Sequence, residues 1–411
     1  MNARQRWYGV FALLFLIVIA YIDRVNIAVM VVNPAFLHHF GLGESRLQQG
    51  TLMTAFLLGY GLAALLLTPF LETLMGYRRA LTLSVLLWAL LTAASPLAGS
   101  VLWLLLVRAL LGVSEGPLFS LKTMYISDHF AANELGKPNA VSALGVSLGL
   151  AIGFPLIGFL MAHFGWAMSF YLLAGFNLLA GLWLIRAFIR PAHNTPPPRA
   201  ASPVLARVWR TFSDAWHTPM LGWIMLVEIA TLSYLWGSSA WLPAYLIDEK
   251  GFSLKQMGAM ASLPFIVSIG AKYLGGALLD RMRPQQAPLI FVIGGGATAL
   301  CVAGLMNSGQ TGWIAFFLLA ANACWAAGRG DPDAAAALRQ AAGGRQRLWH
   351  YQRNRQSVFR LYSAADGMGD GRSGHGVVRV CGADRLTAGH AAGGRRAAGQ
   401  NAPGRALLQR P

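Results

Sequence analysis

The chain is 411 residues long, and its composition is that of a membrane protein: 55% of the residues are hydrophobic, 12% are charged and the mean hydropathy is +0.50. Soluble globular chains carry about 25% charged residues. The three cysteines have no metal-ligand spacing, which argues against a zinc site and a disulfide framework. The basic N-terminus leads into a long apolar run without a small-residue cleavage site, so we expect a first membrane helix and not a removable signal peptide.

Ten segments are apolar over about 20 residues, which is the length that a bilayer-spanning helix needs. Lipid offers the backbone no hydrogen-bond partner, so each segment is expected to be a helix. The ten predicted spans are 7–33, 48–70, 80–98, 101–126, 139–163, 166–189, 219–246, 257–279, 288–307 and 311–327. The predicted fold class is therefore an all-α membrane protein.

The basic residues of the loops predict the orientation, because short cytoplasmic loops are rich in Lys and Arg. Loops on the side of the N-terminus carry twelve basic residues, whereas the alternate loops carry only Arg46, Lys250 and Lys255. The twelve are Arg4, Arg6, Arg78, Arg79, Lys137, Arg186, Arg190, Arg199, Arg207, Arg210, Arg281 and Arg283. The N-terminus is thus expected in the cytoplasm.

The spans fall into two groups. Residues 1–190 hold six spans and predict a complete six-helix half, and the Pro-rich segment 191–215 reads as a flexible cytoplasmic linker. Residues 216–327 hold four further spans. Tight basic connections follow the second span of each group, in "TPFLETLMGYRRAL" and "GGALLDRMRPQQAP". Two parallel six-helix repeats around a central cavity are a transporter plan, so the second half is expected to be truncated after about four helices.

Residues 328–411 break the pattern, because no later segment is long and apolar enough to span. From Arg329 onward the chain has 14 Arg, no Lys and 5 Asp, a net charge of +9 within a total of +17. Arg without Lys, together with Ala and Gly, is typical of GC-rich DNA read out of frame, and the tail begins inside a span. We therefore favour a frameshifted, disordered tail and a pseudogene product. The alternative is a genuine basic tail that contacts RNA or anionic lipid.

Polar side chains lie inside two of the predicted spans. The first span, in "LIVIAYIDRVNIAVMVV", holds Asp23, Arg24 and Asn26 near its middle. The fourth, in "VRALLGVSEGPLFSLKTMY", holds Arg108 and Glu115, which are two helical turns apart and so share a face. Each charge costs about 2.5–3.5 kcal/mol at a helix centre, so such residues usually face a cavity and a partner.

Residues next to Glu115 in the fourth span predict close packing and a local break. Gly112 and Gly116 allow another helix to approach closely. Pro117 is expected to loosen the helix.

Two interpretations of these charges remain open. An arginine presents a planar fork of donors that suits a carboxylate, and a partly buried Asp or Glu can gain and lose a proton. This combination suits proton-coupled uptake of an anion and is favoured for Asp23, Arg24 and Glu115. The alternative is that two static ion pairs only lock the helices together. Arg108 fits either interpretation, as a cavity residue or as a structural partner of Glu115.

The segments "YIDRVNIAV" (21–29) and "RALLGVSEGPLF" (108–119) resemble signature segments of the anion:cation symporter family of the major facilitator superfamily, and "WLPAYLIDEKGFSL" (241–254) resembles the end of its seventh span. The resemblance covers about residues 7–327. It implies twelve helices in two halves, alternating access and, for bacterial members, import of sugar acids or other small carboxylates with protons. By motif, it implies substrate binding by Arg24, Tyr21, Arg108 and Asn26, and proton coupling by Asp23 and Glu115.

The loop after the second span resembles the gating loop of the superfamily. The matching residues are Gly76, Arg78 and Arg79 in the first half and Asp280 and Arg281 in the second. The superfamily usually has an Asp three residues before this glycine. Thr73 stands there in this chain, with Glu72 beside it, which puts the gating contacts in doubt.

Several other polar residues have a favoured structural interpretation. Lys122 is expected to snorkel to the interface, with a second anion-binding charge as the alternative, whereas Lys272 is open between snorkelling and cavity lining. Glu228 is expected to make a helix–helix hydrogen bond. Trp236 and Tyr245 are expected in an interfacial aromatic belt, with substrate contact as the alternative. His38, His39 and His163 are expected to be solvated.

The sequence thus predicts a non-enzymatic, multi-pass transporter of the bacterial inner membrane, acting as a monomer on a small organic anion and protons. No cofactor, metal or nucleic-acid partner is expected, and transport is expected to be impaired by the truncation. The alternatives are an efflux antiporter of the same fold, against which the two intramembrane arginines argue, and a non-functional product.

Overall fold

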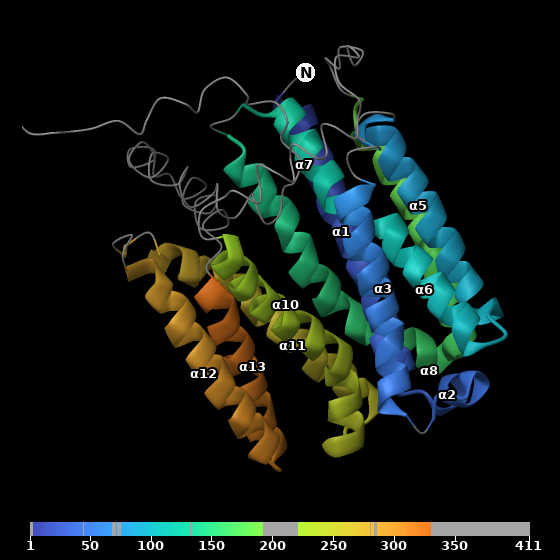
Figure 1. The fold of residues 1–411 in the computed structure, drawn as a ribbon, viewed down its shortest axis with the longest axis vertical. Helices are drawn as coiled ribbons and strands as arrows, with labels where there is room; N and C mark the ends of the chain where they lie inside the picture. The colour runs from blue at the N-terminus through green and yellow to red at the C-terminus, as the bar shows by residue number, and fades with distance from the viewer. Residues whose placement is uncertain are drawn as a thin grey trace, which may run out of the picture. The chain divides into compact units, whose positions relative to one another are not determined.

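The structure is a computed structural model that describes residues 3–43, 45–67, 71, 75–131, 134–191, 221–279, 281–282 and 286–329. The described part of the chain is helical apart from short connections (Figure 1). Most of the predicted linker and the tail beyond Arg329 lie outside the described residues.

Each of the first six predicted spans corresponds to helix in the described residues. The helices are α1 (Ala3–Met30), α2 (Pro34–Phe40), α3 (Arg46–Leu66), α5 (Gly76–Ala94), α6 (Val101–Glu115), α7 (Leu118–His129) and α8 (Gly136–Phe188). The short α2 lies in the first connection, where Asn33 caps it by accepting a hydrogen bond from the Phe36 amide.

Two of these spans depart from a single straight helix. The fourth is divided at Pro117 into α6 and α7, as the proline predicts. The fifth and sixth are joined in α8, whose backbone breaks at Gly165 with φ 79° and ψ 168°, a conformation open to glycine alone. The chain therefore turns back across the membrane at Gly165 without a loop.

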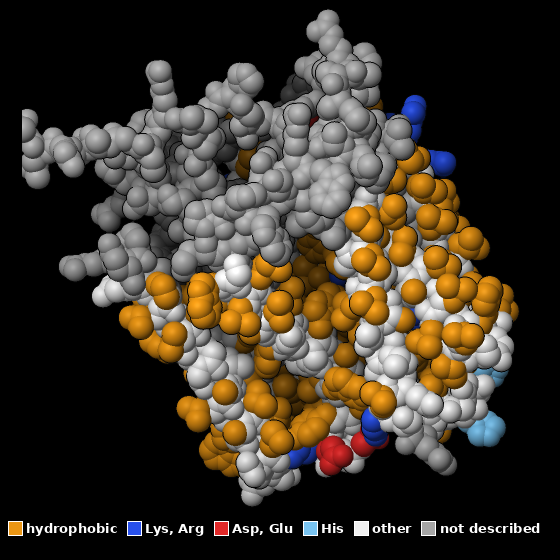
Figure 2. Space-filling model, in the orientation of Figure 1, with side chains coloured by type: hydrophobic (Ala, Val, Ile, Leu, Met, Phe, Trp, Pro, Cys, Tyr) orange, Lys and Arg blue, Asp and Glu red, His pale blue; other side chains and the backbone are white. Residues whose placement is uncertain are grey.

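The second half holds α10 (Leu221–Ala244), a π-helical turn (Tyr245–Glu249), α11 (Leu254–Leu279), α12 (Ala287–Asn307) and α13 (Thr311–Arg329). These helices match the last four predicted spans. By length and composition alone, seven helical stretches in the described residues are long and apolar enough to cross a membrane. Apolar side chains spread over the sides of the helices in Figure 2, as expected for surfaces that face hydrocarbon.

The two helices that open the halves have different surroundings. α1 packs along both parts of α8, and most of its residues are buried. α10 packs chiefly against α1 and its own continuation, and side chains near its start such as Trp223 and Ile229 are exposed. Within the described residues, no helix covers α10 as α8 covers α1. In the described residues, the second half consists of α10, α11, α12 and α13.

Candidate functional site

The structure brings the four predicted intramembrane charges together between α1 and α6. Asp23 and Arg24 come from α1, and Arg108 and Glu115 come from α6. All four side chains are buried, with at most 2% of each residue exposed. The cluster lies in the first half, where α1 is enclosed by its neighbours.

The ion pair in this cluster joins the two helices. Nε of Arg24 donates a hydrogen bond to Oε2 of Glu115 over 2.7 Å. The sequence suggested Arg108 as a possible partner of Glu115, but no hydrogen bond or ion pair between them is present among the described contacts. A shared helix face brought Arg108 and Glu115 to the same cluster but did not make them a pair.

Asp23 is held by neutral donors instead of a cation. Its Oδ2 accepts hydrogen bonds from Oγ1 of Thr92 on α5 over 2.6 Å and from Nδ2 of Asn177 on α8 over 3.2 Å. Both partners are buried. Sequence analysis missed them, although a Thr and an Asn within apolar spans were the available signal.

The guanidinium of Arg24 is surrounded by aromatic rings. Its Cζ lies 4.4 Å from the ring centroid of Tyr21, 4.6 Å from that of Tyr60 and 5.7 Å from that of Trp236. Tyr21 and Trp236 are stacked, with centroids 6.0 Å apart and an interplanar angle of 16°. Trp236 was expected in an interfacial belt, and the structure instead places it beside Arg24 as a contribution of the second half.

Several buried polar atoms in the cluster have no hydrogen-bond partner among the described residues. These atoms are Nη1 and Nη2 of Arg24, Nε and Nη2 of Arg108, both side-chain polar atoms of Asn26, and Oε1 of Glu115. A buried polar group without a partner costs about 1–3 kcal/mol, and more if it is charged. Most buried polar groups are therefore satisfied by protein, water or ligand. The unused donors of two arginines favour an anion as the missing partner.

Glycines set the spacing of the helices behind this cluster. A Cβ at Gly112 would lie 2.0 Å from the carbonyl oxygen of Phe56, and one at Gly116 would lie 2.6 Å from that of Tyr60. The predicted close approach at these glycines is confirmed. It brings α3 against α6 and carries Phe56 and Tyr60 to the two arginines, since the Phe56 ring lies 5.0 Å from Cζ of Arg108.

The predicted gating residues that the structure describes lie apart from this cluster. Gly76 begins α5 with φ 70°, and Nη2 of Arg78 donates to the carbonyl oxygen of Arg186 over 3.3 Å. Arg79 and Arg281 are exposed, and Asp280 lies outside the described residues. Their role in gating stays a prediction.

Lys122 differs from its favoured expectation, and Lys272, for which two interpretations were open, makes a contact between helices. Lys122 is only 8% exposed, and its Nζ lies 5.6 Å from the ring centroid of Phe119, so the structure does not show a snorkelling side chain. Nζ of Lys272 on α11 donates to Oγ of Ser147 on α8 over 3.1 Å. Lys272 thus joins the two halves.

The other polar and aromatic residues that the sequence singled out, where the structure describes them, are not part of the charged cluster. The hydroxyl of Tyr245 donates to the carbonyl oxygen of Leu305 over 3.5 Å. His38, His39 and His163 are exposed, and the side chain of Glu228 lies outside the described residues. Within the described ranges, no group of three His, Cys, Asp or Glu side chains could hold a metal ion.

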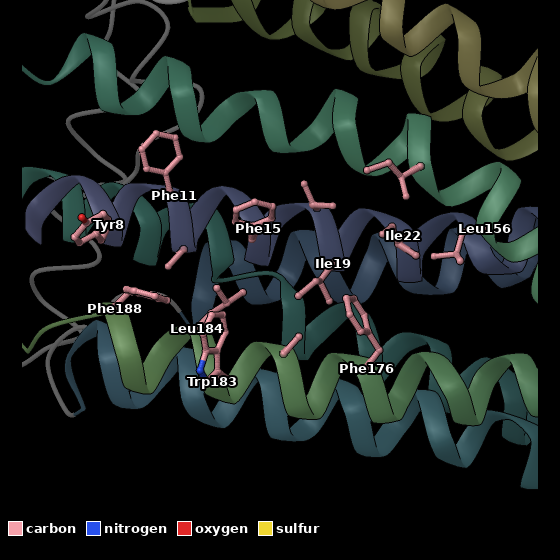
Figure 3. A pocket seen from close by; sticks show the side chains of 14 residues that line it. Tyr8, Phe11, Phe15, Ile19, Ile22, Leu156, Phe176, Trp183, Leu184 and Phe188 are labelled. Carbon is pink, nitrogen blue, oxygen red and sulfur yellow. The ribbon is translucent and has the colours of Figure 1, made fainter. Parts of the chain in front are cut away.

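A groove on the outer side of α1 and α8 is separate from the charged cluster. It has a volume of about 540 Å³ and runs from Tyr8 and Phe188 at one end to Ile22 and Leu156 at the other (Figure 3). Its lining is apolar, and exposed rings such as Phe15 border it. A groove of this kind suits hydrocarbon, and none of the charged residues described above lines it.

The comparisons with known proteins agree with this architecture. The model of the Major Facilitator Superfamily matches residues 13–336, which is most of the chain. The chain belongs to the major facilitator superfamily. It is therefore a membrane transporter and not an enzyme, as the sequence predicted.

Several curated relatives of this superfamily member are named as transporters of organic anions. A probable sulfoacetate transporter of Cupriavidus necator is 30% identical, over 70% of this chain and 68% of the relative. A probable L-galactonate transporter of Escherichia coli is 26% identical, over 76% and 73% of the two chains. A hexuronate transporter of Bacillus subtilis is 27% identical, over 66% and 63%.

Solved structures share the fold. A bacterial homologue of the human lysosomal transporter Spinster superposes with a TM-score of 0.65 at 18% identity, covering 90% of this chain and 81% of that one. A D-xylose–proton symporter superposes with a TM-score of 0.54 at 14% identity, covering 82% and 87%.

Proposed function

We propose that this transporter binds a small organic anion at Arg24 and moves it across the bacterial inner membrane together with protons, by alternating access. The observation that carries the proposal is the state of the Arg24 guanidinium. Its Nε is occupied by Glu115, whereas Nη1 and Nη2 are buried without a partner in the described structure.

The geometry favours a carboxylate as the ligand. Nη1 and Nη2 are the two parallel donors with which arginine binds a carboxylate in bidentate fashion. Glu115 engages Nε, so the substrate can bind the other two nitrogens while the ion pair stays in place. The donors of Arg108 and the amide of Asn26 supply further hydrogen-bonding groups for the same ligand.

The aromatic rings around Arg24 suggest what lies next to the carboxylate. Tyr21 and Trp236 present stacked apolar faces that suit the C–H groups of a short carbon chain. Trp236 belongs to the second half, so the substrate would contact both halves, as alternating access around a central site requires. The names of the relatives, which include sulfoacetate, L-galactonate and hexuronate transporters, support a sugar acid or similar anion.

Two buried acids support proton coupling. Asp23 and Glu115 are enclosed in apolar helices, and acids inside a membrane are commonly part of proton relays. We assign proton coupling to both. The cytoplasmic N-terminus, the location in the inner membrane and a monomeric state belong to the same proposal and rest on the charge asymmetry of the loops and the fold.

We further infer that transport by this chain is impaired. α10 contributes Trp236 to the site, yet the side chains near its start are exposed where the first half has a covering helix. A frameshift near Gly328 would remove the helices that cover it. Without them, the second half cannot enclose the substrate.

An uptake assay tests both the proposed symport and the proposed impairment. It compares cells that express this chain with cells that express a version whose reading frame is restored after codon 327. Labelled glucuronate, galactonate and sulfoacetate are offered under an inward proton gradient. We expect the restored version to accumulate at least one anion until a protonophore collapses the gradient, and this chain to accumulate little. Accumulation that ignores the gradient would contradict symport, and robust accumulation by this chain would contradict impairment.

A further inference from the structure

The two acids in the site have different partners. Glu115 is paired with a cation, Arg24, whereas none of the three ion pairs among the described residues includes Asp23. Protonation of Glu115 removes a buried counter-charge from Arg24, which is costly. Protonation of Asp23 breaks no ion pair. Asp23 is therefore the acid that can accept a proton with the smaller rearrangement.

The two donors to Asp23 come from α5 and α8, whereas Glu115, the ion-pair partner of Arg24, comes from α6. Thr92 is near the end of α5, and Asn177 lies in the second part of α8. Both reach the same oxygen, Oδ2, so three helices of the first half meet at one carboxylate oxygen. Asp23 also feels charged groups from its own helix and from α6, namely Arg24, Arg108 and Glu115.

Both neutral partners can serve either protonation state of Asp23. A threonine hydroxyl donates to a carboxylate and can rotate to accept from a carboxylic acid. Asn177 donates through Nδ2, and its buried Oδ1 has no hydrogen-bond partner in the described structure. That oxygen is an acceptor available to a protonated neighbour after the amide reorients.

We propose that Thr92 and Asn177 are positioning residues that set the proton affinity of Asp23 and exchange hydrogen-bond roles when it gains or loses its proton. The proton enters from water and leaves to water, and no other bond changes. The inference rests on the proposed role of Asp23 as a proton-coupling acid, but it makes a claim about protonation that does not require transport.

The strengths of the hydrogen bonds decide whether removal of a donor raises or lowers the proton affinity of Asp23. A hydrogen bond to an ionised group is about twice as strong as a neutral one. Loss of the Thr92 hydroxyl therefore weakens the ionised form of Asp23 more than the protonated form. The pH at which Asp23 is half protonated should therefore rise by about one unit, which is about a tenfold increase in its proton affinity.

Infrared difference spectroscopy of the purified full-length protein, titrated with pH, measures this directly. The carboxyl band of Asp23 is identified by its loss in Asp23→Asn. We expect its midpoint to move to higher pH in Thr92→Val and in Asn177→Leu, and to stay near that of the unmodified protein in Thr92→Ser, which keeps the hydroxyl.

Ser95→Ala is the matched control. Ser95 directly follows α5, is buried, and donates its hydroxyl hydrogen bond to the carbonyl oxygen of Leu91 instead of to Asp23. Its removal should leave the midpoint unchanged. Equal midpoints in Thr92→Val, Asn177→Leu and the unmodified protein would overturn the inference, as would an equal shift in Ser95→Ala. Absence of uptake with the predicted shifts would count against the transport proposal alone.

Discussion

Arg24 and Glu115 form a hydrogen-bonded ion pair across α1 and α6, with 2.7 Å between Nε and Oε2 and both side chains buried. The pair is 91 residues apart in sequence and lies where the polar segments of the first and fourth spans meet. It leaves the other two guanidinium nitrogens of Arg24 available. The pair thus links the two helices and, in the proposed function, presents two free nitrogens of Arg24 to the anion.

Removal of one partner of this pair should strongly destabilise the protein. Glu115→Leu leaves the Arg24 charge buried without a counter-ion, for which we expect a loss of about 3–5 kcal/mol. Thermal unfolding in detergent measures the change. The double variant Arg24→Leu, Glu115→Leu should be less destabilised than Glu115→Leu alone. A double variant that is as unstable as the sum of the two single variants would argue that the pair is not coupled.

The close approach of α3 and α6 should tolerate no side chain at Gly112. A Cβ there meets the carbonyl oxygen of Phe56 at 2.0 Å, so Gly112→Ala forces the helices apart and moves Phe56 away from Arg108. We expect a large fall in the thermal unfolding temperature. Gly61→Ala on α3 is the control, because nothing lies within 4 Å of its Cβ. It should be neutral or slightly stabilising.

Trp236 should contribute to anion binding through its ring. Trp236→Ala removes the face stacked on Tyr21 and near Arg24, and we expect binding to weaken about threefold to thirtyfold, as for loss of a cation–π contact. Trp236→Phe should retain most of the affinity. Trp223→Ala, an exposed position on the same helix, should have no effect. Equal losses in the Trp223 and Trp236 variants, measured by calorimetry, would remove Trp236 from the site.

The halves should be joined at the end of the molecule where α3 begins. Arg46 forms an ion pair with Asp248 in the turn after α10. In a background with the native cysteines replaced by serine, Arg46→Cys with Asp248→Cys should be cross-linked by a bifunctional thiol reagent whose spacer replaces the reach of the arginine side chain. Leu47→Cys with Asp248→Cys is the control, since Leu47 lies on another face of α3 and is highly exposed. Cross-linking of the control alone would contradict the arrangement.

The ion pair between Arg6 and Glu134 should make a small, pH-dependent contribution to stability. A hydrogen bond from Arg6 lowers the pKa of Glu134 below its usual value. A lowered pKa means that the contribution is present above the usual pKa of glutamate and is lost as pH falls through the lowered value. Arg6→Gln should therefore unfold at a lower temperature than the unmodified protein at pH 7, and the gap should close under strongly acidic conditions. A gap that widens on acidification would contradict this pairing.

Hydropathy predicted the helices well because lipid leaves the backbone no alternative to internal hydrogen bonds. Each of the ten predicted spans corresponds to helix in the described residues, and the break at Pro117 and the close approach at Gly112 followed from the residues themselves. The turn at Gly165 was predicted only as a short gap between spans. Its tight reversal depends on the positive-φ conformation of Gly165, which composition does not reveal.

The partners within the site were harder to predict. Helical spacing placed Arg108 and Glu115 on one face, but it could not say that Glu115 would pair with Arg24 from another helix. Thr92 and Asn177 were missed because a single neutral polar residue in an apolar helix does not indicate a site. Only the fold shows that both side chains contact Asp23. The place of Trp236 depends on contact between the halves, which no local pattern encodes.

Equilibrium binding of small carboxylates to the purified protein tests the central claim most directly, because it requires no transport. We predict that a sugar acid such as glucuronate or galactonate, or sulfoacetate, binds the unmodified protein and binds Arg24→Gln at least about tenfold more weakly. Arg46→Gln, which removes an exposed arginine, should bind as the unmodified protein does. Equal affinity in Arg24→Gln and the unmodified protein would contradict the assignment of Arg24 as the anion-binding residue.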